Sequence, residues 1–444
     1  MANPVNILAL DAILKDYYIG PLQEQLNNEV MVLGMFEKAK ISWAGKQGVV
    51  PVHVDRNTGV GFRAEGADWS TGTGTLTAGS QETKRLLFQA AYLYGRFEVT
   101  GPAIAAAAKG GTASFIGALE LEMDKLKDDI RNTADRTATS GGRVVGFLNQ
   151  HKTEGAAATW EFAGDFAKIV TAYNLKGSNI DVSVVDCSSD ALSGDTVTYE
   201  FITTSAAIDI THAGFNPTNG TIRLTNALNT ATVADGFACA LVISDTNAAV
   251  TAVLDNQPAG IYGNLGYVDL FGVDRGSVAG DAMALQSVIV NMDQDNSGDG
   301  DGEALSLARM QEVIDGISVT SGMDPDVILM NPLDRAQYIA LINGNIFKPV
   351  EKATSGDGGF LGLSYGGIPI KAARNVDRGL MLFLNTKCWK LAVLEEGKFA
   401  DLDGSVLSRL ANQDSWEGFY KWYYNHYCYR PNANGILTGF PARS

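Results

Sequence analysis

The residues Gly362 to Gly366 read GLSYG, the pattern that presents a nucleophilic serine in α/β-hydrolases. Asp401 or Asp403, and then His426, follow Ser364 in the chain order of that catalytic triad. The hydrolase turn requires a strand before the serine and a helix after it. Here a glycine-rich TSGDGGF precedes the serine and a strand-like GIPI follows it. We therefore expect a loop at this position and assign no catalytic residue.

A second stretch that could do chemistry is the acidic loop 293–303, DQDNSGDGDGE, which partly matches the calcium loop of an EF-hand. Positions one, three, five and six of that loop are Asp293, Asp295, Ser297 and Gly298. Position twelve, which needs a bidentate glutamate, is Ala304, because Glu303 comes one residue early. A register that starts at Asp295 places Ser306 at position twelve, so neither register is complete.

The carboxylates of this loop also have an explanation that needs no metal. Asp299, Asp301 and Glu303 come just before a predicted helix, where negative charge is favoured by the helix dipole and by unpaired N–H groups. We therefore assign no metal site and expect no cofactor. A calcium ion bound at 293–303 stays open as the alternative.

The remaining metal ligands and charges exclude several classes of site. The cysteines and histidines are widely spaced, without a C-x-x-C pair or an H-E-x-x-H helix; they are Cys187, Cys239, Cys388, Cys428, His53, His151, His212 and His426. The net charge of −16 argues against sequence-independent DNA binding, which depends on clustered Lys and Arg. The aromatic segment SWEGFYKWYYNHYCYRP contains few basic residues, so it predicts a packed strand and not a base-stacking platform.

The bulk composition is that of a globular protein of two to four domains. Its 444 residues are 45% hydrophobic and 19% charged, which is enough apolar material for a large core. The N-terminus lacks the basic and apolar regions of a signal peptide, and no stretch approaches the ~18 apolar residues of a membrane span. We expect a protein without membrane contact that is made in a reducing cytoplasm.

The N-terminal third predicts three elements in sequence. Apolar residues at helical spacing make 1–45 an amphipathic arm. Two β-like runs around a long small-residue tip make 46–100 an extended hairpin, which cannot be stable alone and must lie on another surface. Within 101–152, the apolar stripe from Phe115 to Ala134 predicts a long helix that ends at Gly141 and Gly142.

The rest of the chain changes from β-rich to mixed α/β. Residues 153–256 contain short strand-like runs separated by Gly, Asn, Asp and Ser, which predicts a compact all-β insert. Residues 277–400 alternate helices with strands. There NPLD opens a helix with Asn331 as cap and Asp334 at the helix N-terminus. Residues 401–444 supply the closing strands.

The order of these parts resembles the major capsid proteins of tailed double-stranded-DNA bacteriophages, with the Hong Kong 97-type fold. LKDYYIGPLQEQLNNEV resembles the family's arm, and GKQGVVPVHVDRNTGVGFRAEG resembles the first strand of its extended loop. YVDLFGVDRGS is similar to the entry to its axial domain. LARMQEVIDGISVTSGMDPDVILMNPLDRAQYIALI is similar to that domain's helix-strand-helix core. The insert 153–256 departs from the minimal family pattern.

The resemblance implies an α+β phage capsid fold, divided as 1–45 arm, 46–100 extended loop, 101–152 and 257–276 peripheral domain with a spine helix, 153–256 insertion domain, 277–400 axial domain, and 401–444 C-terminal strands. It implies a non-enzymatic subunit that self-assembles, as hexamers and pentamers, into an icosahedral virion capsid. The shell would form in the host bacterial cytoplasm around packaged DNA that is not read by sequence. Its partners would be a portal protein, a separate scaffolding protein and decoration proteins.

Three alternatives remain open at this point. An encapsulin-like compartment shares the fold but encloses a protein cargo. A secreted β-rich adhesin would explain the insert, but it would need a secretion signal. A calcium-dependent hydrolytic enzyme would need the acidic loop and GLSYG to act together.

Overall fold

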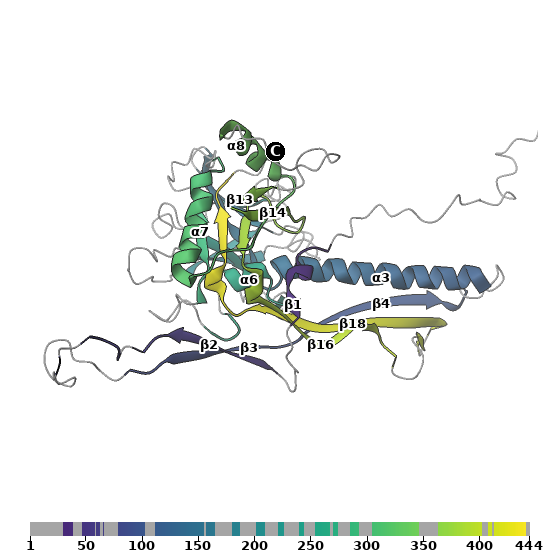
Figure 1. The fold of residues 1–444 in the computed structure, drawn as a ribbon. Helices are drawn as coiled ribbons and strands as arrows, with labels where there is room; N and C mark the ends of the chain where they lie inside the picture. Colours follow the sequence, from purple (N-terminus) through teal and green to yellow (C-terminus); the bar gives the residue numbers. More distant parts are fainter. Residues whose placement is uncertain are drawn as a thin grey trace, which may run out of the picture.

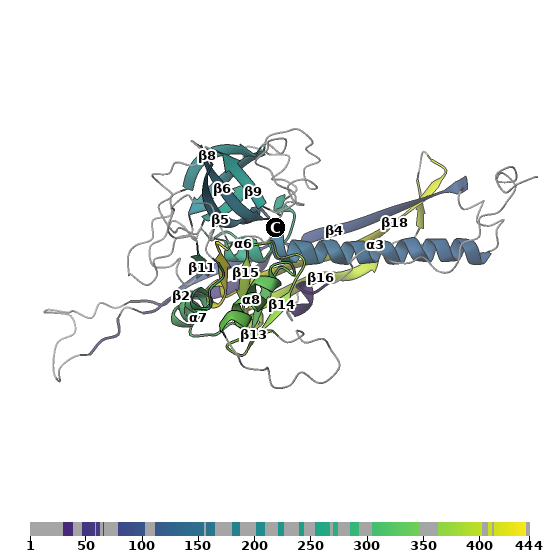
Figure 2. The same ribbon diagram turned by 90° about the horizontal axis from the view of Figure 1, so that it is seen from above.

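The computed structural model describes residues 30–38, 47–57, 59–62, 65, 79–102, 112–154, 157–164, 180–186, 201–208, 221–225, 239–243, 254–266, 270–273, 285–292, 304–345, 363–401, 407–410 and 413–440. These residues form a mixed α+β structure. A head built on one sheet lies above a long strip of strands and helix that extends to the right in Figure 1. A hairpin extends from the base of the head to the left. A second β-sheet unit lies beside the head (Figure 2).

The longest helix, α3 (Thr112–Ser140), lies along a five-stranded sheet (Figure 1). At ~1.5 Å per residue its 29 residues extend for about 43 Å. Where the predicted apolar stripe is described, it faces inward, since Ile130 and Ala134 are buried. The helix stops directly before Gly141, in agreement with the prediction.

The strands under α3 come from both ends of the chain. They are β1 (Glu37–Lys38), β4 (Ala91–Thr100), β16 (Trp389–Phe399), β17 (Leu407–Arg409) and β18 (Ser415–Cys428). The central strand β18 pairs antiparallel with β4 along one side and with β17 and then β16 along the other. The aromatic C-terminal segment is thus the packed strand that the sequence predicts, with Tyr424 and Tyr427 buried.

The projecting hairpin consists of β2 (Gly48–Asp55) and β3 (Glu82–Phe88), which pair antiparallel. The sequence predicts a single β-like run through LLFQAAYLYGRFEVT, but the structure divides this run at Gln89. Residues 91–100 form β4 and belong to the five-stranded sheet, so the paired part of the hairpin is shorter than the predicted range 46–100. The side-chain amide of Asn425 donates to the Gln89 carbonyl (2.6 Å) at the point of division.

The head is a six-stranded mixed sheet in the order β11-β19-β15-β12-β14-β13. Its strands are β11 (Val288–Asn291), β12 (Val327–Met330), β13 (Ser364–Tyr365), β14 (Ile368–Ala372), β15 (Met381–Leu384) and β19 (Gly435–Thr438). The late strand β19 lies between β11 and β15, so the C-terminal segment completes the middle of this sheet.

The helices of the head are α7 (Leu307–Ser321) and α8 (Arg335–Asn345). The Asn331 side chain accepts the N–H of Leu333 (3.0 Å) in the turn directly before α8, so it is the cap that the sequence predicts. The Ser306 side chain caps α7 by accepting from the N–H of Ala308 (3.2 Å). Asp334 directly precedes α8, at the helix N-terminus as predicted. It is fully buried, accepts the N–H of Gly379 (2.8 Å) and lies 3.8 Å from the Arg378 guanidinium, so it also joins two loops of the head.

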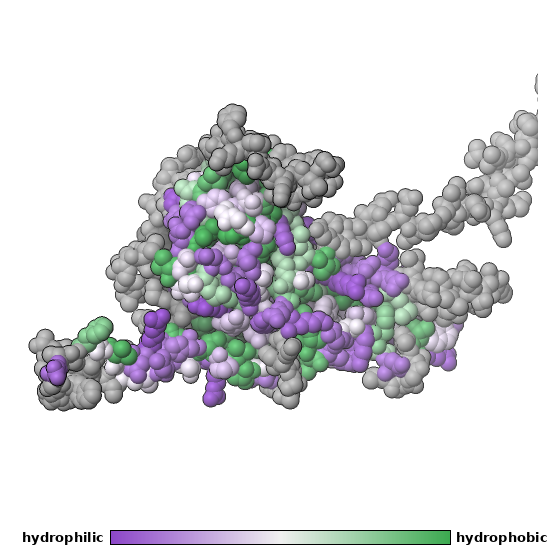
Figure 3. Space-filling view, viewed as in Figure 1, coloured by the Kyte–Doolittle hydropathy of each residue, from purple (hydrophilic) through white to green (hydrophobic). Residues whose placement is uncertain are grey.

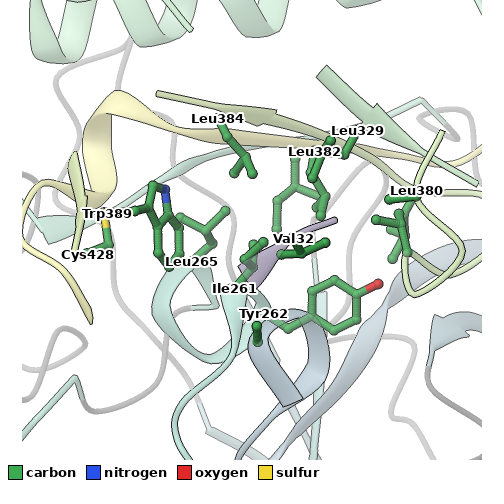
Figure 4. Close-up of a cluster of buried hydrophobic side chains, with 14 of the residues drawn as sticks. Val32, Ile261, Tyr262, Leu265, Leu329, Leu380, Leu382, Leu384, Trp389 and Cys428 are labelled. Atoms are coloured by element: carbon green, nitrogen blue, oxygen red, sulfur yellow. The ribbon is translucent and has the colours of Figure 1, made fainter. Parts of the chain in front are cut away.

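One apolar core connects the head to the strip of strands below it. The short helix α6 (Ile261–Leu265) inserts Ile261, Tyr262 and Leu265 between the sheets, beside Leu382 of β15 and Trp389 of β16 (Figure 4). Val32 reaches the same core, which holds the start of the described chain against residues more than two hundred positions later.

The β-rich unit beside the head is a six-stranded antiparallel sheet in the order β8-β7-β10-β5-β6-β9 (Figure 2). Its strands are β5 (Val144–Glu154), β6 (Ala157–Gly164), β7 (Ile180–Asp186), β8 (Phe201–Ile208), β9 (Thr221–Thr225) and β10 (Cys239–Ile243). The first strand begins at Val144, inside the predicted peripheral segment 101–152. Val144 and Phe147 belong to the core beside α6, so this unit grows directly out of the body.

Candidate functional site

The residues that matched catalytic and metal patterns do not form a site in the part of the chain that is described. Ser364 lies in β13, and the strand β14 follows it after a Gly366-Gly367 turn, so the helix of a hydrolase elbow is missing. His426 lies in a different sheet, fully buried against the ring of Phe36. Asp401 is exposed, and Asp403 is outside the described residues.

The acidic loop 293–303 also lies outside the described residues, so the calcium alternative stays a prediction. Elsewhere in the described chain, no three His, Cys, Asp or Glu side chains gather as metal ligands would. None of the described helices is long and apolar enough to cross a membrane. Cys388 and Cys428 are buried free thiols.

The feature that stands out instead is the hairpin, whose two faces differ. One face packs on the body: Val52 and Leu86 form a cluster with Leu270 and Leu285. The predicted alternation of Val50, Val52 and Val54 is this inner face. The hairpin is therefore fixed at its base by apolar contacts.

One turn of the body, residues 270–273, contacts the base of the hairpin. Phe271 and Gly272 both have positive φ (49° and 82°) in a tight turn that is closed by the bridge between Leu270 and Val273. Positive φ is strained for a bulky residue such as phenylalanine. The strained turn is held by the hairpin, because the Phe271 carbonyl accepts the N–H of Leu87 (2.9 Å) and its ring packs edge-on against Phe88 (5.9 Å).

The opposite face of the hairpin carries apolar side chains into solvent. Val49 and Leu87 are directly opposite each other in the register, and they are 53% and 40% exposed. Beyond the paired strands, Val60 and Phe62 are exposed almost completely. Apolar residues stand among polar ones along this projection (Figure 3). An apolar face on a thin projecting element is a candidate surface for another protein.

A second exposed surface lies on the five-stranded sheet, on the face away from α3. Tyr92 and Tyr94 of β4 are more than half exposed and contact Tyr423 of β18 edge-on. The hydroxyl of Tyr94 donates to that of Tyr423 (3.0 Å), and this bond is the first cause of a raised pKa for Tyr94. Lys421 lies over the Tyr423 ring (5.6 Å) and pairs with Glu395 (3.0 Å).

These surfaces were only partly visible in the sequence. The alternation that placed Val50, Val52 and Val54 inside also places Val49 outside, so the hairpin's exposed face could have been read from the same pattern. The exposure of Tyr92 and Tyr94 could not be predicted from the sequence, because an aromatic residue in a strand usually lies in the core. The face of the five-stranded sheet that α3 covers depends on tertiary packing, so the local sequence pattern does not predict it.

Comparison with known proteins adds the fold. No protein-family model matches the chain, and no curated protein matches its sequence. Among solved structures, the capsid asymmetric unit of cyanophage A-1(L) aligns with 98% of this chain and 99% of the other, at a TM-score of 0.55 and 12% identity. The chain has the fold of that phage capsid protein.

Two further solved structures are more distant. The capsid of the native GTA particle aligns with a TM-score of 0.47 and 9% identity, and Microbacterium phage Oxtober96 with 0.45 and 10%. Both alignments cover 98% of this chain and 99% of the other. The fold rests on the cyanophage alignment, which confirms the resemblance drawn from the sequence.

Proposed function

We propose that this protein is the major subunit of an icosahedral phage capsid, a virion shell that encloses a double-stranded-DNA genome. The observation that carries the proposal is the alignment with the cyanophage capsid chain over nearly the whole length of both chains. The acidic balance of −16 suits a shell that must enclose DNA without adhering to it.

The hairpin supplies the physical reason for self-assembly. Its inner face is fixed on the body, while Val49 and Leu87 remain exposed on the outer face. A projection of one subunit that lies on a different surface of the next makes a head-to-tail contact, and such contacts form rings when the rotation between subunits closes. We assign the hairpin this role, with the rings as the hexamers and pentamers of the shell.

The other parts take roles that fit the same model. The head formed within 277–400, completed by β19, surrounds the ring axes, while the arm 1–45 reaches a neighbouring subunit. The β-rich unit within 144–256 faces outward, where decoration proteins bind. A portal protein and a separate scaffolding protein are the remaining partners, and assembly takes place in the bacterial cytoplasm.

The test is to produce the chain with its scaffolding protein and to examine the product by electron microscopy. Closed shells of uniform size support the proposal, and nucleic acid inside shells made during infection distinguishes a genome capsid from a compartment for protein cargo. Persistently monomeric protein would contradict it.

One hairpin variant and a matched control test whether the exposed face of the hairpin makes the contact between subunits. Leu87→Asp places a charge on the hairpin's exposed face, so we expect at least a tenfold loss of shells with an unchanged unfolding temperature of the free subunit. Val319→Asp, at a 72% exposed valine on α7, is the matched control and should assemble as the parent does.

A further inference from the structure

The strand β4 is an open edge of the five-stranded sheet. Within the described residues it pairs only with β18, through an unbroken register of ten residue pairs from Ala91 to Thr100. No other described element hydrogen-bonds to its outer side, where it runs along the border of the sheet beside α3 (Figure 2). An open edge presents a row of backbone donors and acceptors that another strand can use.

Two other outer strands of this molecule, β2 and β16, carry features that hinder such pairing. In β2, Pro51 lacks an N–H and the register shifts between His53 and Asp55. In β16, the pairing with β18 shifts register at two places, and the two-residue strand β1 covers part of its outer side. Bulges, prolines and covering segments are the devices by which proteins prevent edge pairing. Strand β4 has no proline and no register shift.

The side chains of β4 are complementary to a second copy of themselves. Gly95 packs toward Ile130 and Leu126 of α3, so the alternate residues Arg96 and Glu98 stand on the opposite, solvent face. In an antiparallel pair, residues directly opposite each other share a face. A two-fold pairing of β4 with β4 is therefore centred on a residue.

When the centre is Phe97, Arg96 of each copy lies opposite Glu98 of the other, and two cross-strand ion pairs form. Within one subunit the Arg96 guanidinium pairs with Glu417 of β18 (2.9 Å) and lies 3.6 Å from Glu98.

We propose that β4 pairs antiparallel with β4 of a second copy about a two-fold axis at Phe97, which joins the two five-stranded sheets into one continuous sheet. This contact rests on the proposed function and adds to it. Head-to-tail contacts close into rings, whereas an isologous contact links one ring to the next. With Phe97 at the centre, residues 94–100 of each copy pair. These seven residues from each copy bury far less surface than the ~1,200 Å² of a stable dimer. The contact therefore forms in the shell, where many weak contacts act together.

The test uses opposite charge reversals. Chains with Arg96→Glu place two Glu–Glu pairs across the axis, and chains with Glu98→Arg place two Arg–Arg pairs there. Each variant alone should give at least tenfold fewer shells than the parent under conditions in which the parent assembles. Co-production of the two variants restores both Arg–Glu pairs, so the yield should return to within about threefold of the parent. Lys398→Glu, a reversal at an exposed lysine of β16, is the control and should assemble normally.

A second readout follows the backbone. Amide hydrogen exchange across 94–100 should slow in shells relative to free subunits, because the outer N–H groups become paired. Normal assembly of both single variants overturns the proposal, and so does failure of the mixture to assemble when each free variant is folded. In the latter case Arg96 and Glu98 act within one subunit or on another partner. If the parent chain forms no shells, the proposed function fails and this contact fails with it.

Discussion

At the scale of single residues, His426 has the opposite role to the catalytic one that its position after Ser364 suggested. It is completely buried, and burial lowers its pKa from 6.5 to about 3, opposed only by a contact with the backbone of Ala259. The ring lies 5.3 Å from that of Phe36, so a neutral imidazole fills space between β18 and the N-terminal segment.

The buried imidazole makes the free subunit sensitive to acid. Below pH 6.5 the unfolded chain binds a proton at His426 while the folded chain stays neutral until about pH 3. Between these values the free energy of unfolding should fall with decreasing pH by up to about 1.4 kcal/mol per pH unit from this residue. Denaturant unfolding from pH 7 to 5, compared with His426→Leu, measures the difference. Equal slopes in the two proteins would refute the assignment.

Asp135 is a second residue whose environment decides its role. This buried carboxylate of α3 accepts the N–H of Leu33 (2.8 Å) and the side-chain amide of Asn375 (2.6 Å). It therefore joins the spine helix to the N-terminal segment and to the head. Nothing in the alternation of charges along α3 distinguishes it from its exposed neighbours.

Removal of this carboxylate should leave two donors without their partner. Asp135→Ala should lower the free energy of unfolding by about 1–3 kcal/mol, since an unsatisfied buried donor loses its full solvation. Asp129→Ala, at an exposed aspartate of the same helix, should change it by less than ~0.5 kcal/mol. Chemical denaturation of both variants makes the comparison, and equal effects would show that Asp135 has no joining role.

At the scale of elements, the end of α3 is fixed by a close backbone contact. A Cβ added to Gly141 would lie 2.2 Å from the Pro258 carbonyl oxygen, and the N–H of Gly260 donates to the Gly141 carbonyl (3.1 Å). The glycine therefore does more than end the helix. It allows α6, with its core residues, to approach.

A methyl group at this contact must displace backbone. Gly141→Ala should destabilise the subunit by about 1–3 kcal/mol, the range observed for overpacked cores. Gly263→Ala, in α6, is the control, because its Cβ would meet nothing closer than 3.4 Å. Thermal unfolding of the two variants separates the close contact from the general effect of replacing glycine. A stable Gly141→Ala protein would show that α6 can move away without cost.

The elements that the sequence predicted well are those with a local signal. The period of α3 and the alternation of β2 follow from side chains a few residues apart. The division between β3 and β4 carries no glycine or proline; it depends on the pairing of β4 with β18, more than three hundred residues later. The start of β5 at Val144 was missed for the same reason, since that strand begins in the core beside α6. The exposed face of the hairpin lay within the predicted alternation, but the open edge of β4 is a property of the sheet.

At the scale of the whole molecule, the assembly that we propose would bring together many copies of a chain with a net charge of −16. Their mutual repulsion opposes association and is screened by salt, with a Debye length of about 10 Å at 0.1 M and about 3 Å at 1 M. We therefore expect the lowest protein concentration that yields shells to decrease as NaCl rises from 50 mM to 500 mM, by roughly threefold or more. Light scattering of purified subunits measures it. A concentration that rises with salt would show that ion pairs at the contacts outweigh the overall repulsion.

The strand β19 comes late in the chain, yet it pairs with two strands of the head and completes their sheet. Gly435–Thr438 fills the gap between β11 and β15, two strands that precede it in the chain and have no direct pairing with each other. A product that stops before Gly435 leaves both strands with an open edge and the head incomplete. If the chain is the capsid subunit that we propose, a product that stops before Gly435 should be absent from assembled shells, because its head sheet lacks the strand that joins β11 to β15.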